Sequence, residues 1–185
     1  MQYRSVTPAY IPRLHEIRAD YLSDRYLRVI NTGEKFEVGF TLQVEELEEP
    51  FRSQGLSIIR EKDKELIKSR MDGQALQVVV EEDGRLIGLL DVEIESWRRV
   101  AKIWNLLVDE EYRRQGIGTE LMRRAEGFAT ENACRAIVVE TQITNWPALN
   151  FYLKRGFQIC AVDDHFYTNH DLERKEVALF LYYEL

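Results

Sequence analysis

The sequence has 185 residues, a length that suits one domain with a buried core, so we expect a single domain over residues 1–185. Hydrophobic residues make up 45% and charged residues 31%, a balance typical of a globular chain. The formal net charge of -7 argues against a nucleic-acid binder or a protein of anionic membrane surfaces, because phosphate contacts need a cationic face. An acidic surface instead suits a small cationic substrate.

The sequence predicts neither a targeting segment nor a membrane span. Charged residues interrupt residues 1–22, and no run approaches the ~18 uninterrupted apolar residues that a membrane-spanning helix needs. Two cysteines, Cys134 and Cys160, are too few for a disulfide framework or a metal site, so we expect no metal. We interpret both as small buried side chains in a reducing cytoplasm. The oligomeric state is left open, with a homodimer as one alternative.

The N-terminal part of the chain has weak patterns. Residues 2–7 are typical of a short strand. Apolar residues at helical spacing then predict an amphipathic helix, on Ile11, Leu14, Ile17, Tyr21 and Leu22. A second helix is predicted over residues 57–71, with Ile59, Leu66 and Ile67 facing inward.

From Ala75 onward the pattern predicts strands. Residues 75–80 are rich in β-branched side chains, residues 82–84 (Glu-Asp-Gly) indicate a hairpin turn, and a second strand follows over 85–95. Within it, apolar and acidic residues alternate, which predicts one apolar face and one acidic face carrying Asp91, Glu93 and Glu95. A third strand is expected over residues 101–108.

The C-terminal part alternates helices and strands. Residues 116–132 predict a helix, with Ile117, Leu121, Ala125 and Phe128 on one face. Residues 136–140 read as a central strand covered on both faces. A short helix over 145–154 precedes two last strands, over 157–162 and 177–183, which a polar loop separates. This order predicts an α/β sheet with antiparallel pieces and one helical crossover after residue 116.

The segment from Leu106 to Thr119 carries the most specific signal. A strand runs into a turn and then into a helix, and Gly116 and Gly118 let a ligand approach the backbone. The first N–H groups of a helix lack internal partners and lie at the positive end of its dipole. Together with Arg113 and Arg114, they predict a seat for an anion.

Two better-known phosphate loops do not fit this turn. A Walker A loop needs a lysine directly after its last glycine, and Gly118 is followed by Thr119. A dinucleotide-binding fingerprint needs a third glycine three positions later, where this chain has Leu121. By itself, a Gly-x-Gly at a helix start indicates no more than a structural turn.

Two motifs in sequence narrow the interpretation. The pattern Arg113-x-x-Gly116-x-Gly118, preceded by Leu106-x-Val108, resembles the acetyl-CoA signature of the GNAT superfamily of N-acetyltransferases. About 30 residues downstream, residues 145–157 resemble the second motif of that family, through Asn145, Ala148, Phe151, Tyr152, Gly156 and Phe157. The run 140–142 and the ending 176–185 are similar to the streptothricin acetyltransferase branch.

The resemblance covers roughly residues 75–185 and implies a fold. That fold is a GNAT-like α/β domain of the α+β type: a central mixed, mostly antiparallel, twisted sheet of about six to seven strands flanked by about four helices. Over residues 1–70 it implies only one strand and two helices, the elements that family members usually have there.

The resemblance also implies which residues bind acetyl-CoA, the co-substrate. Acetyl-pantetheine would lie between the strands at 103–108 and 136–141, with backbone groups near its acetyl carbonyl and amides coming from Leu106, Leu107 and Val108. The pyrophosphate would be cradled by Arg113, Arg114, Gln115, Gly116, Ile117, Gly118 and Thr119. Asn145 would sit beside the pantetheine arm, and Tyr152 near the thioester sulfur.

The implied reaction is direct transfer of the acetyl group to a neutral amine, largely by positioning. Tyr152 suits protonation of the departing thiolate, with a packed aromatic as the structural alternative. Many GNAT enzymes carry a glutamate on the strand before the pyrophosphate turn, but Trp104 and Asn105 stand there. Candidate bases are therefore Glu140, the acidic residues of strand 85–95, or a water chain. Each carboxylate could instead have a purely structural role.

The loop Asp163–Tyr167 mixes acids with aromatics, which suits a cationic amine, although an exposed polar loop explains it equally well. We interpret His165 and His170 as surface residues. The leading hypothesis is a cytoplasmic N-acetyltransferase of a small-molecule amine, including a streptothricin-like antibiotic. The alternatives are a protein or peptide N-acetyltransferase and a non-catalytic acyl-CoA-binding sensor.

Overall fold

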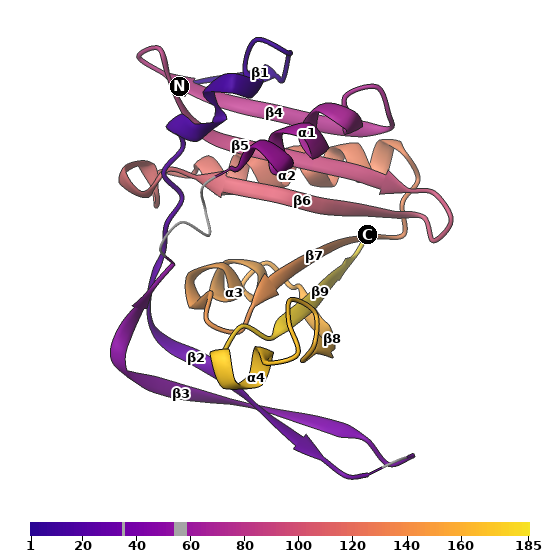
Figure 1. The fold of residues 1–185 in the computed structure, drawn as a ribbon. Coiled ribbons are helices and arrows are strands. Elements are labelled where there is room, and N and C mark those ends of the chain that lie inside the picture. Colours follow the sequence, from indigo (N-terminus) through magenta and orange to yellow (C-terminus); the bar gives the residue numbers. More distant parts are fainter. Residues whose placement is uncertain (35, 54–58) are drawn as a thin grey trace. The chain divides into compact units, whose positions relative to one another are not determined.

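The computed structural model describes residues 1–34, 36–53 and 59–185 (Figure 1). The chain forms two compact units. Unit 1 consists of Met1–Asp20, Ser53–Val138 and Glu184–Leu185, and unit 2 of Tyr21–Arg52 and Val139–Tyr183.

Unit 1 is built on an antiparallel sheet whose strands lie in the order β1-β4-β5-β6 (Figure 1). The turn between β4 and β5 has positive φ angles at Asp83 (49°) and Gly84 (78°), as the favoured two-residue hairpin turn requires. The three predicted strands over residues 75–108, with their hairpin turn, are therefore confirmed. The strands are β1 (Gln2–Ser5), β4 (Ala75–Glu82), β5 (Arg85–Glu95) and β6 (Val100–Val108).

Helices cover the two faces of this sheet. Helix α2 (Ile117–Glu131) buries Ile117, Leu121 and Ala125 as predicted, whereas Phe128 is only half-buried. The short 3-10 helix η1 (Ile11–Glu16) and helix α1 (Glu61–Arg70) lie over the other face (Figure 1). Their core combines Leu14, Ile59 and Ile67 with Val79 and Leu89 of the strands.

The first predicted helix is wrong beyond its opening turn. The backbone is extended at Ile17, and β2 (Leu22–Thr32) begins where the amphipathic pattern was expected to continue. A tertiary contact explains the difference, because the Arg18 N–H donates to the buried Asp109 carboxylate at 3.0 Å. The spacing of Ile17 and Tyr21 reflects two separate burial sites rather than one helix face.

The second predicted helix is confirmed in shorter form as α1. Ile59 and Ile67 are buried as expected, but Leu66 is 47% exposed, so its predicted inward orientation is wrong. Neighbouring residues of a helix point about 100° apart, and Ile67 takes the buried direction. Residues 57 and 58 of the prediction lie outside the described part of the chain.

Unit 2 contains a long antiparallel hairpin that the sequence did not predict. Its strands are β2 and β3 (Gly39–Arg52). Ten residue pairs join them, from Leu22↔Arg52 to Thr32↔Gly39, with a register shift between Ser23 and Arg25. One helix of the two implied for residues 1–70 is thus replaced by strands. The Leu27 N–H donates to the carbonyl of Ile143 at 3.1 Å, which anchors the hairpin within this unit.

The remainder of unit 2 follows the predicted order. Three strands lie in the order β7-β9-β8, and β8 pairs antiparallel with β9. The polar loop before β9 also contains one short helix that was not predicted. These elements are β7 (Ala136–Gln142, which enters this unit at Val139), α3 (Trp146–Leu153), β8 (Gln158–Asp163), α4 (Asp171–Arg174) and β9 (Ala178–Glu184).

Two predictions of burial are wrong. Asp91 does not lie on an exposed acidic face but is fully buried, because the α1 side of the sheet supplies partners for its carboxylate. Cys134 is buried as expected, whereas Cys160 is exposed on β8, at the edge of its sheet. His165 and His170 are both exposed, in agreement with the prediction.

Candidate functional site

The predicted anion seat, Arg114–Thr119, lies in unit 1 at the start of α2. Gly116 caps the helix with a φ of 86°, a conformation that favours glycine. A Cβ built on Gly116 would meet no atom within 4 Å, so this position faces open space. The Gly116 carbonyl accepts from the N–H of Glu120 at 3.0 Å, which closes the first turn of α2 directly after the glycine.

The turn that presents this seat is held by Asp109, a fully buried carboxylate at the end of β6. It accepts from the backbone N–H of Glu111 at 3.1 Å and of Arg18 at 3.0 Å, and it also accepts from Arg85 at 2.5 Å. A buried carboxylate with three donors is well satisfied, so the turn has a fixed shape without a ligand. Asp109 was not singled out from sequence, because its partners are remote in the chain.

The side chains of the turn differ in burial and in hydrogen bonding. The Arg113 guanidinium is half-buried and donates to backbone carbonyls, whereas Arg114 is exposed. Gln115 is also exposed and donates to the Glu111 carbonyl at 3.4 Å.

Strand β6 carries the predicted pantetheine contacts at its end. Leu106, Leu107 and Val108 are half-buried and pair with Leu90, Leu89 and Gly88 of β5. Upstream, the register shifts so that Asn105 pairs with Asp91 while Ile103 pairs with Val92. Trp104 is therefore the extra residue of a β-bulge, a feature that often lies next to active sites.

The bulge places Trp104 where many family members carry a glutamate, and its ring is held by charged neighbours. Arg70 lies 5.0 Å and Lys102 3.4 Å from the ring centroid. The indole N–H donates to Glu93 at 2.8 Å. The Trp104 ring is thus fixed by cation–π contacts and one hydrogen bond.

All three acids of β5 have partners within unit 1. Asp91 accepts from Arg70 and from Gln77, and the Asn105 amide donates to it at 3.2 Å. Glu93 accepts from Trp104. Glu95 pairs with Arg98 and, at 3.8 Å, with Lys102. A carboxylate that balances a buried cation is poorly placed to take a proton, which disfavours Asp91 in particular as the base.

Two further predicted residues lie on or beside α3 in unit 2. Asn145 caps this helix, and its side-chain oxygen accepts from the N–H of Ala148 at 3.2 Å. Tyr152 is 5% exposed, with its ring centroid 5.4 Å from that of Phe151 and 5.3 Å from that of Phe157. Its hydroxyl has no hydrogen-bond partner in the described part of the chain. Burial, and next the negative charge of Glu140, raise its pKa above the ordinary 10.

Glu140 is the centre of a tyrosine–glutamate cluster in unit 2, formed by Tyr21, Glu140, Tyr152 and Tyr167. The Tyr167 hydroxyl donates to the Glu140 carboxylate. Burial raises the pKa of Tyr21 to about 12 and that of Tyr167 further, and the charge of Glu140 contributes to both shifts. The charge of Glu140 thus acts on three phenols from separate segments, which remain protonated at neutral pH, and the Tyr167 phenol bonds its carboxylate directly.

The loop that supplies Tyr167 is organised by Asp171, which is fully buried. Its carboxylate accepts from the N–H groups of Tyr167 at 2.8 Å and Thr168 at 2.7 Å. Burial alone would raise the pKa of Asp171, but these hydrogen bonds outweigh it and lower the pKa. The predicted aromatic loop thus contributes Tyr167, whereas Tyr21 and Asp171 were missed because no local pattern marks them.

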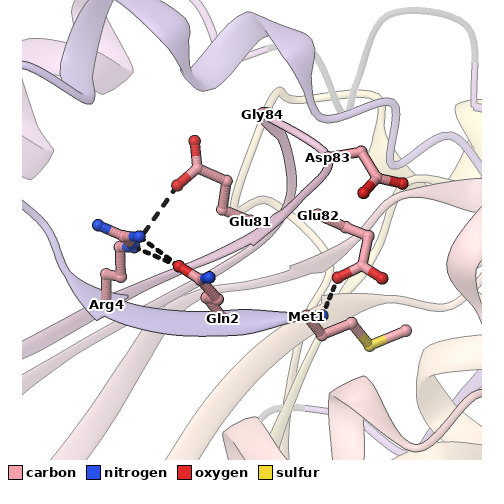
Figure 2. A pocket seen from close by; sticks show the side chains of 7 residues that line it. All are labelled: Met1, Gln2, Arg4, Glu81, Glu82, Asp83 and Gly84. Atoms are coloured by element: carbon pink, nitrogen blue, oxygen red, sulfur yellow. Dashed lines mark hydrogen bonds and ion pairs between the residues drawn. The ribbon is translucent and has the colours of Figure 1, made fainter.

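A separate hollow of about 470 Å³ lies at the β4–β5 hairpin of unit 1 (Figure 2). Four of its charged groups form two pairs: Arg4 lies 3.5 Å from Glu81, and the N-terminal amine pairs with Glu82. Figure 2 shows these pairs along the wall of the hollow, so they are not directed at a ligand. None of the predicted site residues lines it.

The comparisons with known proteins agree with the two motifs. The model of the acetyltransferase (GNAT) family matches residues 40–157, more than half of the chain. This protein belongs to the GNAT acetyltransferase family. The resemblance indicated by residues 106–119 and 145–157 is therefore confirmed.

Among relatives, streptothricin acetyltransferase A of Bacillus subtilis (strain 168) is 35% identical over 102 residues, which are 55% of this chain and 58% of that protein. N-alpha-acetyltransferase 30 of Xenopus laevis is 42% identical over 74 residues, which are 40% of this chain and 27% of that protein. The chain thus matches little more than half the length of the first relative and about a quarter of the second.

A solved structure extends the likeness to the whole fold. The crystal structure of nourseothricin acetyltransferase superposes with a TM-score of 0.81 at 26% sequence identity, covering 99% of this chain and 97% of that one. The predicted fold class, a mixed and mostly antiparallel sheet flanked by helices, is confirmed by this agreement.

Within residues 1–34, 36–53 and 59–185, no helix is both long and apolar enough to span a bilayer. The same residues contain no group of three or more His, Cys, Asp or Glu side chains placed to hold a metal ion.

Proposed function

We propose that this protein is an acetyl-CoA-dependent N-acetyltransferase that acts on a primary amine of a small cationic molecule. The observation that carries the proposal is the preformed anion seat at the start of α2, in a chain that belongs to the GNAT family. A helix N-terminus suits a pyrophosphate because its dipole is positive there and favours negative charge.

The proposed cofactor contacts follow the family motifs. Backbone N–H groups from Arg114 to Thr119 cradle the pyrophosphate, and the positive charges of the turn reinforce it. Backbone groups of β6 at Leu106, Leu107 and Val108 bond the acetyl carbonyl and the pantetheine amides. Asn145 lies beside the pantetheine arm, for which its amide N–H₂ is suited because its oxygen already caps α3.

The proposed chemistry uses Glu140 and Tyr152. Glu140 takes a proton from the substrate ammonium, and the neutral amine attacks the thioester carbonyl carbon. As the C–N bond forms and the C–S bond breaks, the Tyr152 hydroxyl gives its proton to the departing thiolate, and the second proton lost by the new amide nitrogen returns to the Tyr152 phenolate. The raised pKa of Tyr152 keeps the phenol protonated before the transfer step and also makes it a weaker acid.

Glu140 is the proposed base. Its carboxylate accepts from the phenol of Tyr167, and its charge acts on the buried hydroxyl of Tyr152, the proposed acid. Asp91 balances the buried Arg70, which disfavours it as the base. Aromatic rings around a carboxylate are also a favourable environment for a cation.

The acceptor is proposed to be a small amine of the streptothricin type. The support is the likeness to streptothricin acetyltransferase A and to nourseothricin acetyltransferase. The acidic net charge of -7 also favours a cationic substrate. Two free cysteines, one of them exposed, suit a reducing compartment, so we propose a cytoplasmic enzyme.

A second candidate is acetylation of a peptide α-amine. It is favoured by the 42% identity to N-alpha-acetyltransferase 30 over 74 residues. The same cofactor contacts and the same base would serve both acceptors, so the cofactor proposal does not depend on this choice.

The deciding experiment measures thiol release from acetyl-CoA with a panel of amines. The panel contains streptothricin, nourseothricin, free β-lysine, spermidine and short peptides with unblocked α-amines. Preference for the antibiotics supports the small-molecule proposal, and preference for peptides supports the second candidate. If acetyl-CoA binds but no amine releases thiol, the chain is a sensor and both proposals fail.

A further inference from the structure

The turn before α2 contains two adjacent arginines with opposite environments. The Arg113 guanidinium donates through Nε to the Val108 carbonyl at 3.2 Å and through Nη2 to the Ala19 carbonyl at 2.6 Å. Burial lowers the pKa of Arg113. Two of its donors are thus used inside the fold.

Arg114 has none of these contacts. It is exposed, its backbone has a φ of 61°, and its guanidinium has no partner among the residues that the structure describes. A positive φ is uncommon outside glycine, so the turn reverses direction at this residue.

Arg113 makes one of the contacts that fasten residues 18–19 to the turn. The Arg18 N–H donates to Asp109 at 3.0 Å, and the Glu110 N–H donates to the Arg18 carbonyl at 2.7 Å. The Arg18 guanidinium pairs with Glu111 at 2.6 Å, and the Arg113 guanidinium donates to the Ala19 carbonyl. The N-terminal segment and the end of β6 are therefore tied together at the seat.

We propose that Arg113 is a positioning residue, which latches Ala19 to Val108 and so shapes the turn, while Arg114 supplies the side-chain charge for the pyrophosphate. The inference rests on the proposed function for the identity of the anion. It assigns different tasks to two adjacent arginines, of which the family motif specifies Arg113 alone.

The geometry of arginine explains the latch. Its planar fork reaches two carbonyls at a fixed spacing, which the single ammonium of lysine does not reproduce. Without Arg113 the two carbonyls lose a charged donor in a partly buried place, and such losses are costly. The end of β6 would then shift, and every part of a ligand bound along β6 and the turn would be affected.

Two probes separate a latch from a phosphate ligand: coenzyme A, and pantetheine, which lacks the pyrophosphate. We expect Arg114→Gln to weaken coenzyme A by about tenfold, as for one lost charge-assisted bond, and pantetheine by less than about twofold. Arg113→Gln should weaken both probes by the same factor, to within about twofold, with Arg113→Lys recovering only part of the loss. Binding is measured by calorimetry or by competition with labelled coenzyme A.

A ligand-free measurement accompanies the binding data. Amide hydrogen exchange at Arg18 and Glu110 should speed up in Arg113→Gln and stay unchanged in Arg114→Gln. If Arg113→Gln weakens coenzyme A alone and leaves exchange unchanged, Arg113 is a phosphate ligand and the inference is overturned. If the wild type does not bind coenzyme A, the proposed function fails, and the exchange data still decide the latch. Thermal melts verify that each variant is folded.

Discussion

The hydroxyl of Tyr167 donates a hydrogen bond to the carboxylate of Glu140, which joins the loop after β8 to β7. The two residues are 27 positions apart, and Asp171 fixes the loop conformation that makes the contact. The bond orients the Glu140 carboxylate. In the proposed reaction this pair receives the substrate ammonium.

Replacing Tyr167 with phenylalanine removes the hydroxyl and keeps the ring. We expect kcat/KM for the amine to fall by about tenfold, because a hydrogen bond to a charged group is worth roughly 1.5–3 kcal/mol. The dissociation constant of acetyl-CoA should remain unchanged. Tyr182→Phe removes a phenol of the same unit outside the tyrosine–glutamate cluster, and it serves as the control. An equal loss in both variants would contradict the assignment of Tyr167.

Replacing Glu140 with glutamine preserves an acceptor for Tyr167 but removes the proposed base. We expect kcat to fall by at least about 100-fold, the usual contribution of general base catalysis. Acetyl-CoA binding and the melting temperature should stay close to wild type. The loss is measured by thiol release under saturating amine.

The matched control for Glu140 is Glu93→Gln on β5. Glu93 accepts from the Trp104 indole, and its amide analogue keeps that acceptor, so turnover should change little. If Glu93→Gln loses as much activity as Glu140→Gln, the base lies on β5 and the assignment of Glu140 as the base is wrong.

Tyr152→Phe tests the acid that protonates the leaving thiolate. We expect kcat to fall by roughly 100-fold with acetyl-CoA affinity retained, because the phenol acts only as the C–S bond breaks. Burial and the charge of Glu140 raise the pKa of Tyr152, so its protonated, active form persists above the ordinary pKa of 10. Wild-type kcat should therefore show no alkaline fall from Tyr152 below pH 10, and such a fall that disappears in Tyr152→Phe would contradict the environment described here.

The part of the fold that local patterns encode was predicted well. Strand β5 has the predicted bounds. Helices α2 and α3 each begin one residue after the predicted start, because the residue predicted to be the first of each helix is its N-cap. The β2–β3 hairpin was missed because its second strand carries a charged run ending in Pro50, which breaks strand alternation. Its stability comes from contacts such as Leu27 with Ile143, which sequence alone does not reveal.

The candidate site divides in the same way. The anion seat is local, since two glycines and a helix start lie within a few residues, and the sequence was enough to find it. Asp109 contacts Arg18 across 91 positions, so its role in holding the turn needed the structure. Glu140 was proposed as one of several carboxylates, and its contact with Tyr167, 27 positions away, needed the structure.

Gly116→Trp tests the anion seat directly. The φ of 86° makes any side chain unfavourable there, at a cost of roughly 1–2 kcal/mol, so a modest fall in melting temperature is expected. The added ring would fill the open space over the first turn of α2, where the pyrophosphate is proposed to lie. Binding of acetyl-CoA, measured by calorimetry, should be lost.

Gly127→Trp is the matched control for Gly116→Trp. Gly127 lies in the same helix, and a Cβ there would also meet no atom within 4 Å. It is far from the helix start, so acetyl-CoA should bind this variant as it binds the wild type. Since both variants add the same ring to the same helix, a loss of binding confined to Gly116→Trp locates the pyrophosphate at the N-terminus of α2. Unchanged affinity in Gly116→Trp would remove the anion seat, and with it the proposed cofactor contacts of Arg114–Thr119.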